Sequence, residues 1–224
     1  MAIALGTPTG LVGDNSSDSG ETLSHNNGAG SDRVTVGLLY TVDLDVATTM
    51  EYNGVAMIEQ AKIARELGTN RFIWVFTKFG TSTGTNAMVA AFSPNSRSAI
   101  GAVTVTGANQ SDTLDDTNAV NQSSGTSISL PLTASVAGCV AVGITNTASS
   151  TSESAGTNTV LLGTNFDITN MWASSTVPIV SSGSYTLNVN YTTGGAAFAG
   201  VMIAPVAAVS TANNSARRML LMQM

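Results

Sequence analysis

Short apolar runs separated by glycine, serine, threonine and asparagine repeat along the chain, and this pattern predicts β-strands joined by turns. The clearest run, residues 33–40, lies between Asn26-Asn27-Gly28 and Asp43. Residues 71–79 are apolar on both faces of an extended chain, which predicts a central strand. Further strands are expected at residues 86–92, 98–107, 127–132, 138–146, 165–173, 184–191 and 197–205.

The pair Asn53-Gly54 stands between two such runs and is the best hairpin signal in the sequence, because both residues accept a positive φ. The segment that follows, residues 58–67, fits two structures. Its apolar positions share one side at helical spacing, whereas the preceding hairpin favours a strand. We expect a strand that runs into a bulge or a helical turn.

The number and spacing of these runs predict an all-β fold, a two-sheet antiparallel β-sandwich of the jelly-roll-like kind. Hydrophobic residues make up 43% of 224 residues, enough for a single β domain, which we place at residues 21–206. Residues 1–20 are expected to form an N-terminal arm that is ordered only where it docks. Residues 207–224 form a C-terminal tail, and residues 147–158 a low-complexity loop.

The net charge narrows the range of partners. With 8 basic and 14 acidic side chains the formal charge is −6, which argues against nucleic acid and against anionic membrane surfaces as partners. The longest uncharged, mostly apolar run, residues 194–209, is interrupted by Pro205 and is shorter than a membrane span. The first residues lack the basic start and long apolar stretch of a signal peptide, so we expect synthesis in the cytoplasm of a host and release by lysis.

Groups able to do chemistry are scarce. The chain has one histidine, one cysteine and 10% charged residues, which predicts a non-enzymatic protein without a cofactor. His25 is interpreted as a structural residue, and Cys139, inside an apolar run, as a small buried hydrophobic residue. No phosphate-binding loop, zinc spacing or carboxylate pair of a glycosidase stands out.

Carboxylates in loops are the remaining candidates for a ligand site. Asp112, Asp115 and Asp116 are the best-clustered set and predict a possible Ca²⁺ site, although they lack the spacing of an EF-hand. The alternative is that they are solvated turn residues. An exposed Trp172 or Tyr191 could stack on a sugar ring, although a core position is favoured for Trp172.

The C-terminal tail ends on an apolar stretch preceded by two arginines. It either packs back onto its own sandwich or docks on a neighbouring subunit, with the arginines at the rim. The interface residues expected in the second case are Arg217, Arg218, Met219, Leu220, Leu221 and Met222.

The order of several short motifs resembles a jelly-roll-like β-sandwich module of tailed-phage structural proteins and bacterial surface or secreted proteins. That family has no shared catalytic set, so the resemblance implies no catalytic residue, and it covers about residues 20–206. The motifs are Ser24-His25, Asp32–Gly37, Met50–Met57 with its Tyr-Asn-Gly-Val hairpin, Arg71–Phe76, Ala102–Asp112, Tyr185–Tyr191 and Ala196–Pro205.

The resemblance implies a structural protein of the virion, a capsid decoration or a tail or fibre component. Its partners would be other virion proteins and further copies of itself in a homo-oligomer. A glycan-binding module acting at a host or cell surface is the alternative, and a glycoside hydrolase or lyase is the least favoured.

Overall fold

The computed structural model describes residues 3–12, 17–42, 48–65, 70–111, 114–148, 153–162, 171–176 and 181–206. All regular structure in these residues is strand, which confirms the predicted all-β class. The first half of the molecule (residues 3–111) holds β1 (Ala4–Leu5), β2 (Thr9–Val12), β3 (Asp18–Asn26), β4 (Val34–Val42), β5 (Thr48–Tyr52), β6 (Val55–Ala56), β7 (Ile58–Ala64), β8 (Arg71–Phe79) and β9 (Thr85–Thr106). The second half (residues 114–206) holds β10 (Asp116–Gln122), β11 (Ser127–Ala134), β12 (Val140–Thr147), β13 (Ser154–Ala155), β14 (Thr159–Leu161), β15 (Met171–Thr176), β16 (Gly183–Asn190) and β17 (Ala196–Ile203).

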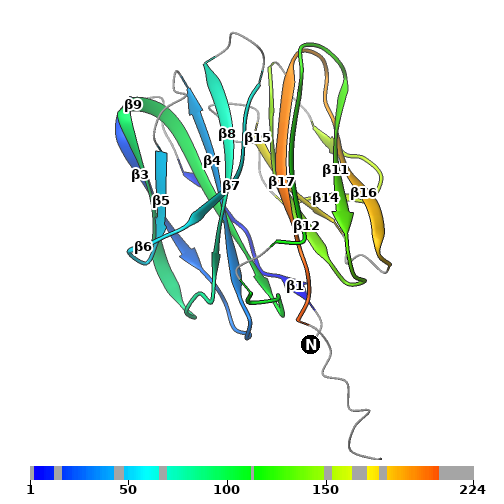
Figure 1. Ribbon diagram of the computed structural model, residues 1–224. Helices are drawn as coiled ribbons and strands as arrows, with labels where there is room; N and C mark the ends of the chain where they lie inside the picture. The colour runs from blue at the N-terminus through cyan, green and yellow to red at the C-terminus, as the bar shows by residue number, and fades with distance from the viewer. Residues whose placement is uncertain are drawn as a thin grey trace, which may run out of the picture.

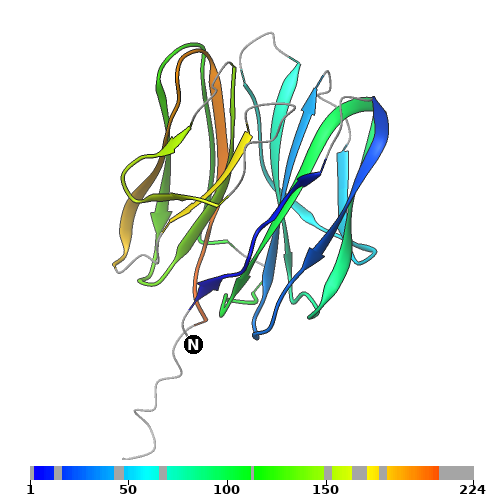
Figure 2. The same ribbon diagram turned by 180° about the vertical axis from the view of Figure 1, so that it is seen from behind.

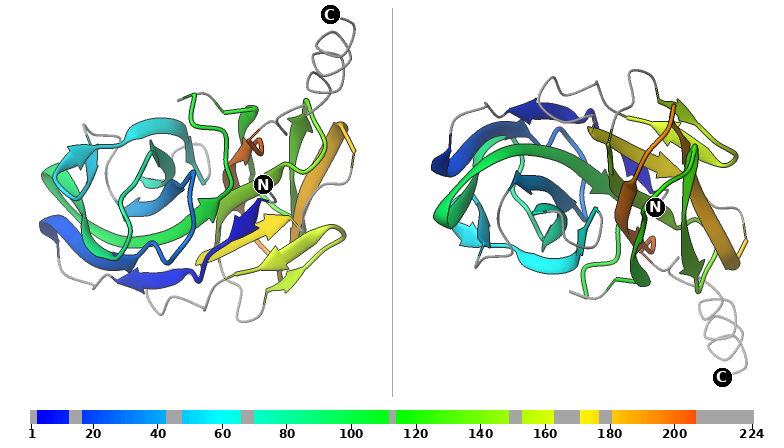
Figure 3. Two further views of the ribbon diagram at one scale, coloured as in Figure 1. Left: turned by 90° about the horizontal axis from the view of Figure 1, so that it is seen from below. Right: turned by 90° about the horizontal axis from the view of Figure 1, so that it is seen from above.

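The strands form layers that stack side by side (Figure 1), and all of the described strand pairs are antiparallel. A nine-stranded sheet makes the first half, a five-stranded sheet faces it, and a three-stranded sheet of β11, β16 and β13 lies outermost. Seen end-on, the nine-stranded sheet nearly encloses its own interior (Figure 3). The fold is therefore compatible with a β-sandwich, but its three sheets replace the two that the sequence led us to expect.

β9 is the reason that one sheet supplies two layers. We expected two strands at residues 86–92 and 98–107, but the chain runs through both as one strand of 22 residues. Its first part pairs with β3 and β5, and its second part pairs with β4, β1 and β2. The same strand thus belongs to both walls of the first half, which a prediction of two separate strands could not show.

A central hydrophobic core joins the two halves. All nine residues of β4 and all eight residues of both β12 and β17 are buried, because each strand has a layer packed on either face. Alternate residues of β4, such as Val36 and Leu38, point into the same cluster as Val142 and Val201 of the second half. These strands have no exposed polar face, because the few threonines and the asparagine of β4 and β12 are buried with the apolar residues, and this lets a layer pack on either side.

Each half also encloses an inner core. That of the first half gathers Trp74, Phe76 and several methionines, and Gly37 of β4 makes room for them, since an added Cβ there would clash with Met50 Sδ. The prediction that residues 71–79 form a central strand is confirmed, with Trp74 and Phe76 on one face and Ile73 and Val75 on the other.

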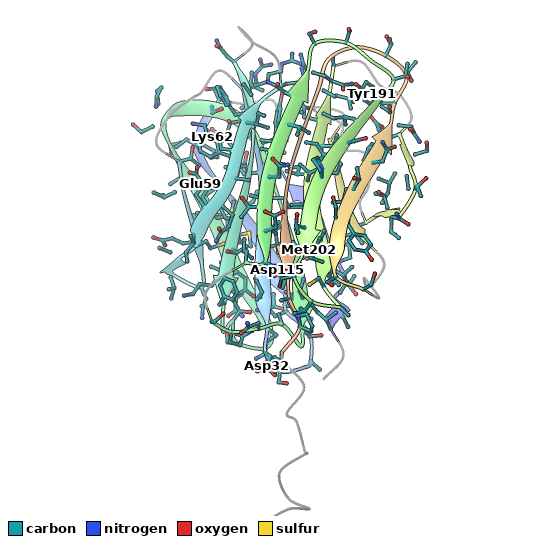
Figure 4. All side chains as sticks on the ribbon, turned by 45° about the vertical axis from the view of Figure 1, so that its right-hand side comes forward. Asp32, Glu59, Lys62, Asp115, Tyr191 and Met202 are labelled. Atoms are coloured by element: carbon teal, nitrogen blue, oxygen red, sulfur yellow. The ribbon has the colours of Figure 1, made fainter. Side chains whose placement is uncertain are left out.

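Lys62 on β7 closes the rim of this inner core. Its Nζ lies 4.1 Å from the centroid of the Trp74 ring and 5.2 Å from that of Phe72, which are cation–π distances. Figure 4 shows Lys62 and Glu59 on the same strand, at the side of the molecule.

The chain at 58–64 is a strand with a register shift between Glu59 and Ala61, as the bulged-strand alternative expected.

The inner core of the second half depends on two facing glycines. Gly143 and Gly200 are register partners on β12 and β17. A Cβ on Gly143 would lie 2.8 Å from both the Ala199 carbonyl oxygen and the Phe198 ring, and a Cβ on Gly200 would lie 2.8 Å from Leu130. Glycine at both positions lets Phe198 and Leu130 fill the space between the sheets.

β10, a strand that the sequence analysis did not predict, ties the two halves together at an edge. Thr117 Oγ1 donates to the Gln60 carbonyl at 3.1 Å, and Asn121 Nδ2 donates to the Ala64 carbonyl at 3.0 Å, both on β7. On its other side, Asn118 Nδ2 donates to the Pro131 carbonyl of β11 at 2.8 Å. The polar side chains of β10 thus donate hydrogen bonds to backbone carbonyls that β7 and β11 would otherwise present to solvent.

The hairpin prediction at Asn53-Gly54 is confirmed, with φ of 52° and 69° at the two turn residues between β5 and β6. The described residues of the expected N-terminal arm, 3–12 and 17–20, are docked on the body, where they contribute β1, β2 and the start of β3 to the nine-stranded sheet. Part of the expected loop at residues 147–158 is strand β13. The tail, residues 207–224, lies outside the described residues.

Candidate functional site

His25 lies at the centre of a buried group of neutral polar side chains where β2, β3 and β9 meet. The residue is fully buried. Its Nδ1 lies 2.6 Å from Thr9 Oγ1 and its Nε2 lies 2.8 Å from Thr104 Oγ1. Its ring also meets Tyr52 edge-on, with centroids 6.4 Å apart.

The neighbouring hydrogen bonds fix the position of the imidazole proton. Thr104 donates its hydroxyl proton to Asn27 Oδ1 at 2.7 Å, so its oxygen accepts from His25 Nε2–H. His25 Nδ1 is then an acceptor, and Thr9 donates to it. Asn27 Oδ1 also accepts from Thr35, 3.0 Å away, which extends the network to β4.

Burial lowers the pKa of His25 from 6.5 to about 4, so the ring is neutral at neutral pH. Its hydrogen-bond partners are threonine hydroxyls that are themselves engaged, and the network joins strands distant in sequence. This arrangement suits a structural role, as the sequence analysis interpreted it, because a general base needs a nucleophile within reach and an orienting partner.

Asp115 and Asp116, two of the three candidate Ca²⁺ ligands, accept hydrogen bonds from the backbone around β11. Asp115 Oδ2 accepts from Ser135 N at 2.6 Å, and its Oδ1 accepts from the Ser135 hydroxyl. Asp116 Oδ2 accepts from Thr133 N at 2.6 Å. The third candidate, Asp112, lies outside the described residues.

These carboxylates therefore fasten the start of β10 to the end of β11. Within the part of the chain that the structure describes, no three histidine, cysteine or acidic side chains come close enough to hold a metal ion. Asp115 and Asp116 thus act as hydrogen-bond acceptors within the fold, and a Ca²⁺ site that includes Asp112 stays a prediction.

Cys139 is fully buried in the inner core of the second half, as its apolar run predicted. Its Sγ lies 3.2 Å from Asp115 Oδ2 and 3.2 Å from the Val136 carbonyl, so its single S–H proton has two acceptors within reach. Burial, followed by the hydrogen bond and charge of Asp115, raises the pKa of the thiol to about 12. A thiol of this kind is a poor nucleophile, because the thiolate is the reactive form.

Neither aromatic residue considered for sugar stacking is available on a described surface. Tyr191 is 5% exposed in the inner core of the second half, where its hydroxyl accepts from Gln122 Nε2. Figure 4 places Tyr191 at the end of the second half opposite to Asp115. The idea that Tyr191 stacks on a sugar is therefore wrong, and the side chain of Trp172 lies outside the described residues.

The outermost sheet presents a surface that the sequence analysis missed, which we call the outer polar face. Its residues alternate with buried ones along β11 and β16 and are register partners across the two strands. Asn188 Nδ2 donates to Ser129 Oγ at 2.7 Å on this face. Its members are Ser127, Ser129, Pro131, Thr133, Ser184, Thr186, Asn188 and Asn190.

The outer polar face carries no charged residue. Between residues 117 and 206 the sequence has only Glu153 and Asp167 as charged side chains, so almost all of the charge belongs to the first half and the tail. This uneven distribution is visible in the sequence and was the signal that could have located the face.

The expected interface residues of the tail, residues 217–222, lie outside the described part of the chain. The described residues contain no helix long and apolar enough to cross a membrane. No family model matches the chain, and no curated protein matches it either.

Proposed function

We propose that this protein is a non-enzymatic structural subunit of a tailed-phage virion, a capsid decoration or a tail or fibre component, that acts through contacts between subunits. The observation that carries the proposal is that the side chains considered for catalysis or metal binding take part in the internal hydrogen bonding of the fold. His25, Cys139, Asp115 and Asp116 all make hydrogen bonds within the fold. These groups stabilise the fold, so we expect the protein to act through its surface.

The outer polar face supports the same proposal. Interface centres in proteins are depleted of charged side chains, because burying an unpaired charge is costly. Copies of a chain with a net charge of −6 repel one another least where they bear no charge, and the outer polar face meets this condition. The resemblance of the motif order to phage structural modules agrees with a role in a particle.

Mass spectrometry of purified particles from the phage that encodes the chain tests the proposal directly. We expect the protein in intact, washed particles at a fixed number of copies. Its absence from particles, with the protein free in the lysate, would overturn the proposal. Deleting residues 207–224 then tests the tail, because unchanged incorporation and oligomeric state would remove the role proposed for Arg217 to Met222.

The outer polar face has its own test with a matched control. The variant Ser129→Lys/Thr186→Lys places two charges on this face, where both side chains are exposed. The control Thr22→Lys/Thr49→Lys places the same charges on exposed sites of β3 and β5, at the far side of the molecule. We expect the first variant alone to lose incorporation by about tenfold, the effect of about 1.4 kcal/mol. Equal incorporation of both variants would show that the face is not an interface.

Binding of a neutral glycan at a host surface is the second candidate. The hydroxyl and amide groups of the outer polar face favour it, because such groups hydrogen-bond to sugar hydroxyls without a charge. A glycan array screened with and without a chelator tests this function and any Ca²⁺ dependence. Binding that the Ser129→Lys/Thr186→Lys variant abolishes would support it, and no binding in either condition would exclude it.

A further inference from the structure

The N-terminal segment, residues 3–12, is attached to the outside of β9. β1 and β2 pair with the second part of β9 and with no other strand that the structure describes. Figure 2 shows these strands in dark blue, running along β9 on the side away from β4. The segment is therefore the outermost strand at that edge of the sheet, and it covers the backbone groups of β9 there.

Pairing of this segment with β9 is interrupted, unlike that of β4. β4 pairs with β9 over nine consecutive positions, from Val34↔Val105 to Val42↔Arg97. β1 contributes two positions, and the register shifts within β2 between Thr9 and Val12. Gly6 N, between the two short strands, donates to the Thr104 carbonyl at 2.7 Å. Interrupted ladders at an edge open more easily than continuous ones inside a sheet.

Two side-chain contacts hold the segment in place. Ile3 is 7% exposed and joins the central core, with Leu5 packed against the same cluster. Thr9 donates to His25 Nδ1 at 2.6 Å. The pairing residues on β9 stand about a hundred positions further along the chain, at Ala4↔Thr106, so the segment docks on the body much as a separate peptide does.

We propose that this edge of β9 is a strand-docking site that also accepts the N-terminal segment of a second copy of the chain, so that exchanged strands join neighbouring subunits. The proposal rests on the subunit function proposed above and names one of its contacts. A second copy presents the same Ile3, Leu5 and Thr9 in the same register, so every contact of the closed monomer is remade in the exchanged pair. Residues 1–12 carry no charged side chain, so the negatively charged copies meet without a like charge at this site.

Two single-cysteine populations test the exchange. Ala4 and Thr106 are antiparallel register partners, and the Cα atoms of such partners lie about 4.5–5.5 Å apart, which suits a disulfide. Protein with Ala4→Cys is mixed with protein carrying Thr106→Cys and oxidised. We expect a disulfide-linked heterodimer in a yield above that of random collision, because the segment of one copy lies on β9 of another.

The comparison pair is Ala4→Cys with Thr186→Cys, an exposed site on the outer polar face, which measures random collision. The double variant Ala4→Cys/Thr106→Cys in one chain verifies that the geometry allows the bond. Cys139 does not interfere, because it is fully buried. A heterodimer yield no higher than that of the comparison pair, with the double variant closing normally, would overturn the proposal.

Thr9→Val weakens the attachment while keeping the shape of the side chain. We expect this variant to form the heterodimer on the order of tenfold faster, the factor that corresponds to one lost hydrogen bond to a buried group. Thr7→Val, at an exposed position between β1 and β2, is the control and leaves the rate unchanged. Equal rates in both variants would contradict the role of the Thr9–His25 contact in holding the segment.

The intrachain disulfide of Ala4→Cys/Thr106→Cys separates this inference from the proposed function. If the oxidised protein no longer enters particles or oligomers, and reduction restores entry, exchange is part of assembly. If the oxidised protein assembles as well as the unmodified chain, exchange is excluded as an assembly contact, and the proposed virion function stands on its other contacts.

Discussion

Single residues with polar side chains hold the first half together where its strands end. His25 links β3 to Thr9 of β2 and to Thr104 of β9, and Asn27 carries the network on to Thr35 of β4. A protonated imidazole would present a second N–H to Thr9, whose oxygen would have to accept instead of donate. The neutral form of His25 is thus the one that the folded protein selects.

Stability is expected to depend on pH through His25. The pKa is about 4 in the folded protein and 6.5 as the ordinary value, so between these limits the unfolded chain binds more protons. The contribution of neutral His25 to the free energy of unfolding is fully present above pH 6.5 and is lost as the pH falls toward 4. The loss amounts to about 3 kcal/mol at pH 4. Urea unfolding at pH 7, 6 and 5 measures it in the range where carboxylates contribute least.

The variant His25→Gln removes the titrating group and serves as the control. It is expected to be less stable than the wild type at pH 7, because buried hydrogen bonds are lost, and to show a smaller change in unfolding free energy between pH 6.5 and 5. The same pH dependence in both proteins would show that other groups cause it.

Gly143→Ala is expected to destabilise the second half. The added methyl group meets the Ala199 carbonyl and the Phe198 ring at 2.8 Å, and the backbone atom cannot move aside cheaply. We expect a loss of about 1–3 kcal/mol in the free energy of unfolding, the usual cost of overpacking. Denaturant unfolding measures it, with Ser184→Ala on the exposed outer polar face as a control that changes stability by less than about 0.5 kcal/mol.

Among the described elements, β10 connects the halves through polar side chains. The double variant Thr117→Val/Asn121→Leu removes both hydrogen bonds to β7. Because both side chains are exposed, we expect a loss of about 1–2 kcal/mol in total and faster hydrogen exchange of the β7 amides. Unchanged exchange in β7 would mean that the apolar contacts of the central core alone hold that edge.

Element predictions succeeded where the hydrophobic pattern was local. The continuous apolar runs of β4, β8 and β17 and the Asn53-Gly54 turn were each predicted from a few adjacent residues. β10 was missed because its sequence, DTNAVNQ, is polar and is held by side chains that reach neighbouring strands. The pairing of β1 and β2 with β9 depends on residues about a hundred positions away, which no local pattern reveals.

Candidate sites were harder to predict than strands, for a related reason. The sequence shows that Asp115 and Asp116 are close together. It does not show that their carboxylate oxygens accept hydrogen bonds from the backbone amides of Ser135 and Thr133. It likewise gives no hint that Tyr191 points into a core. The uneven distribution of charge along the chain, in contrast, could have been read without a structure.

Across the whole molecule, the central core makes the two halves depend on each other. Residues of β4, β8 and β9 share this core with residues of β12 and β17. Ile144→Ala, at a fully buried site in the second half, is therefore expected to destabilise both halves by about 2–5 kcal/mol in one cooperative transition. Hydrogen exchange of β8 and β16 amides near the unfolding midpoint checks this, and two separate transitions would show that the halves unfold independently.

The length of β9 has a consequence for the growing polypeptide on the ribosome. β1, β2 and β3 find their only described pairing partner in β9, and β4 and β5 pair with it too, so all five strands are synthesised before the strand they need. Nascent chains shorter than about 106 residues then have unpaired apolar strands and depend on chaperones or on rapid translation. The first half is expected to become resistant to protease only after Thr106, and then β12 and β17 that share its central core, have left the exit tunnel, in a single late step.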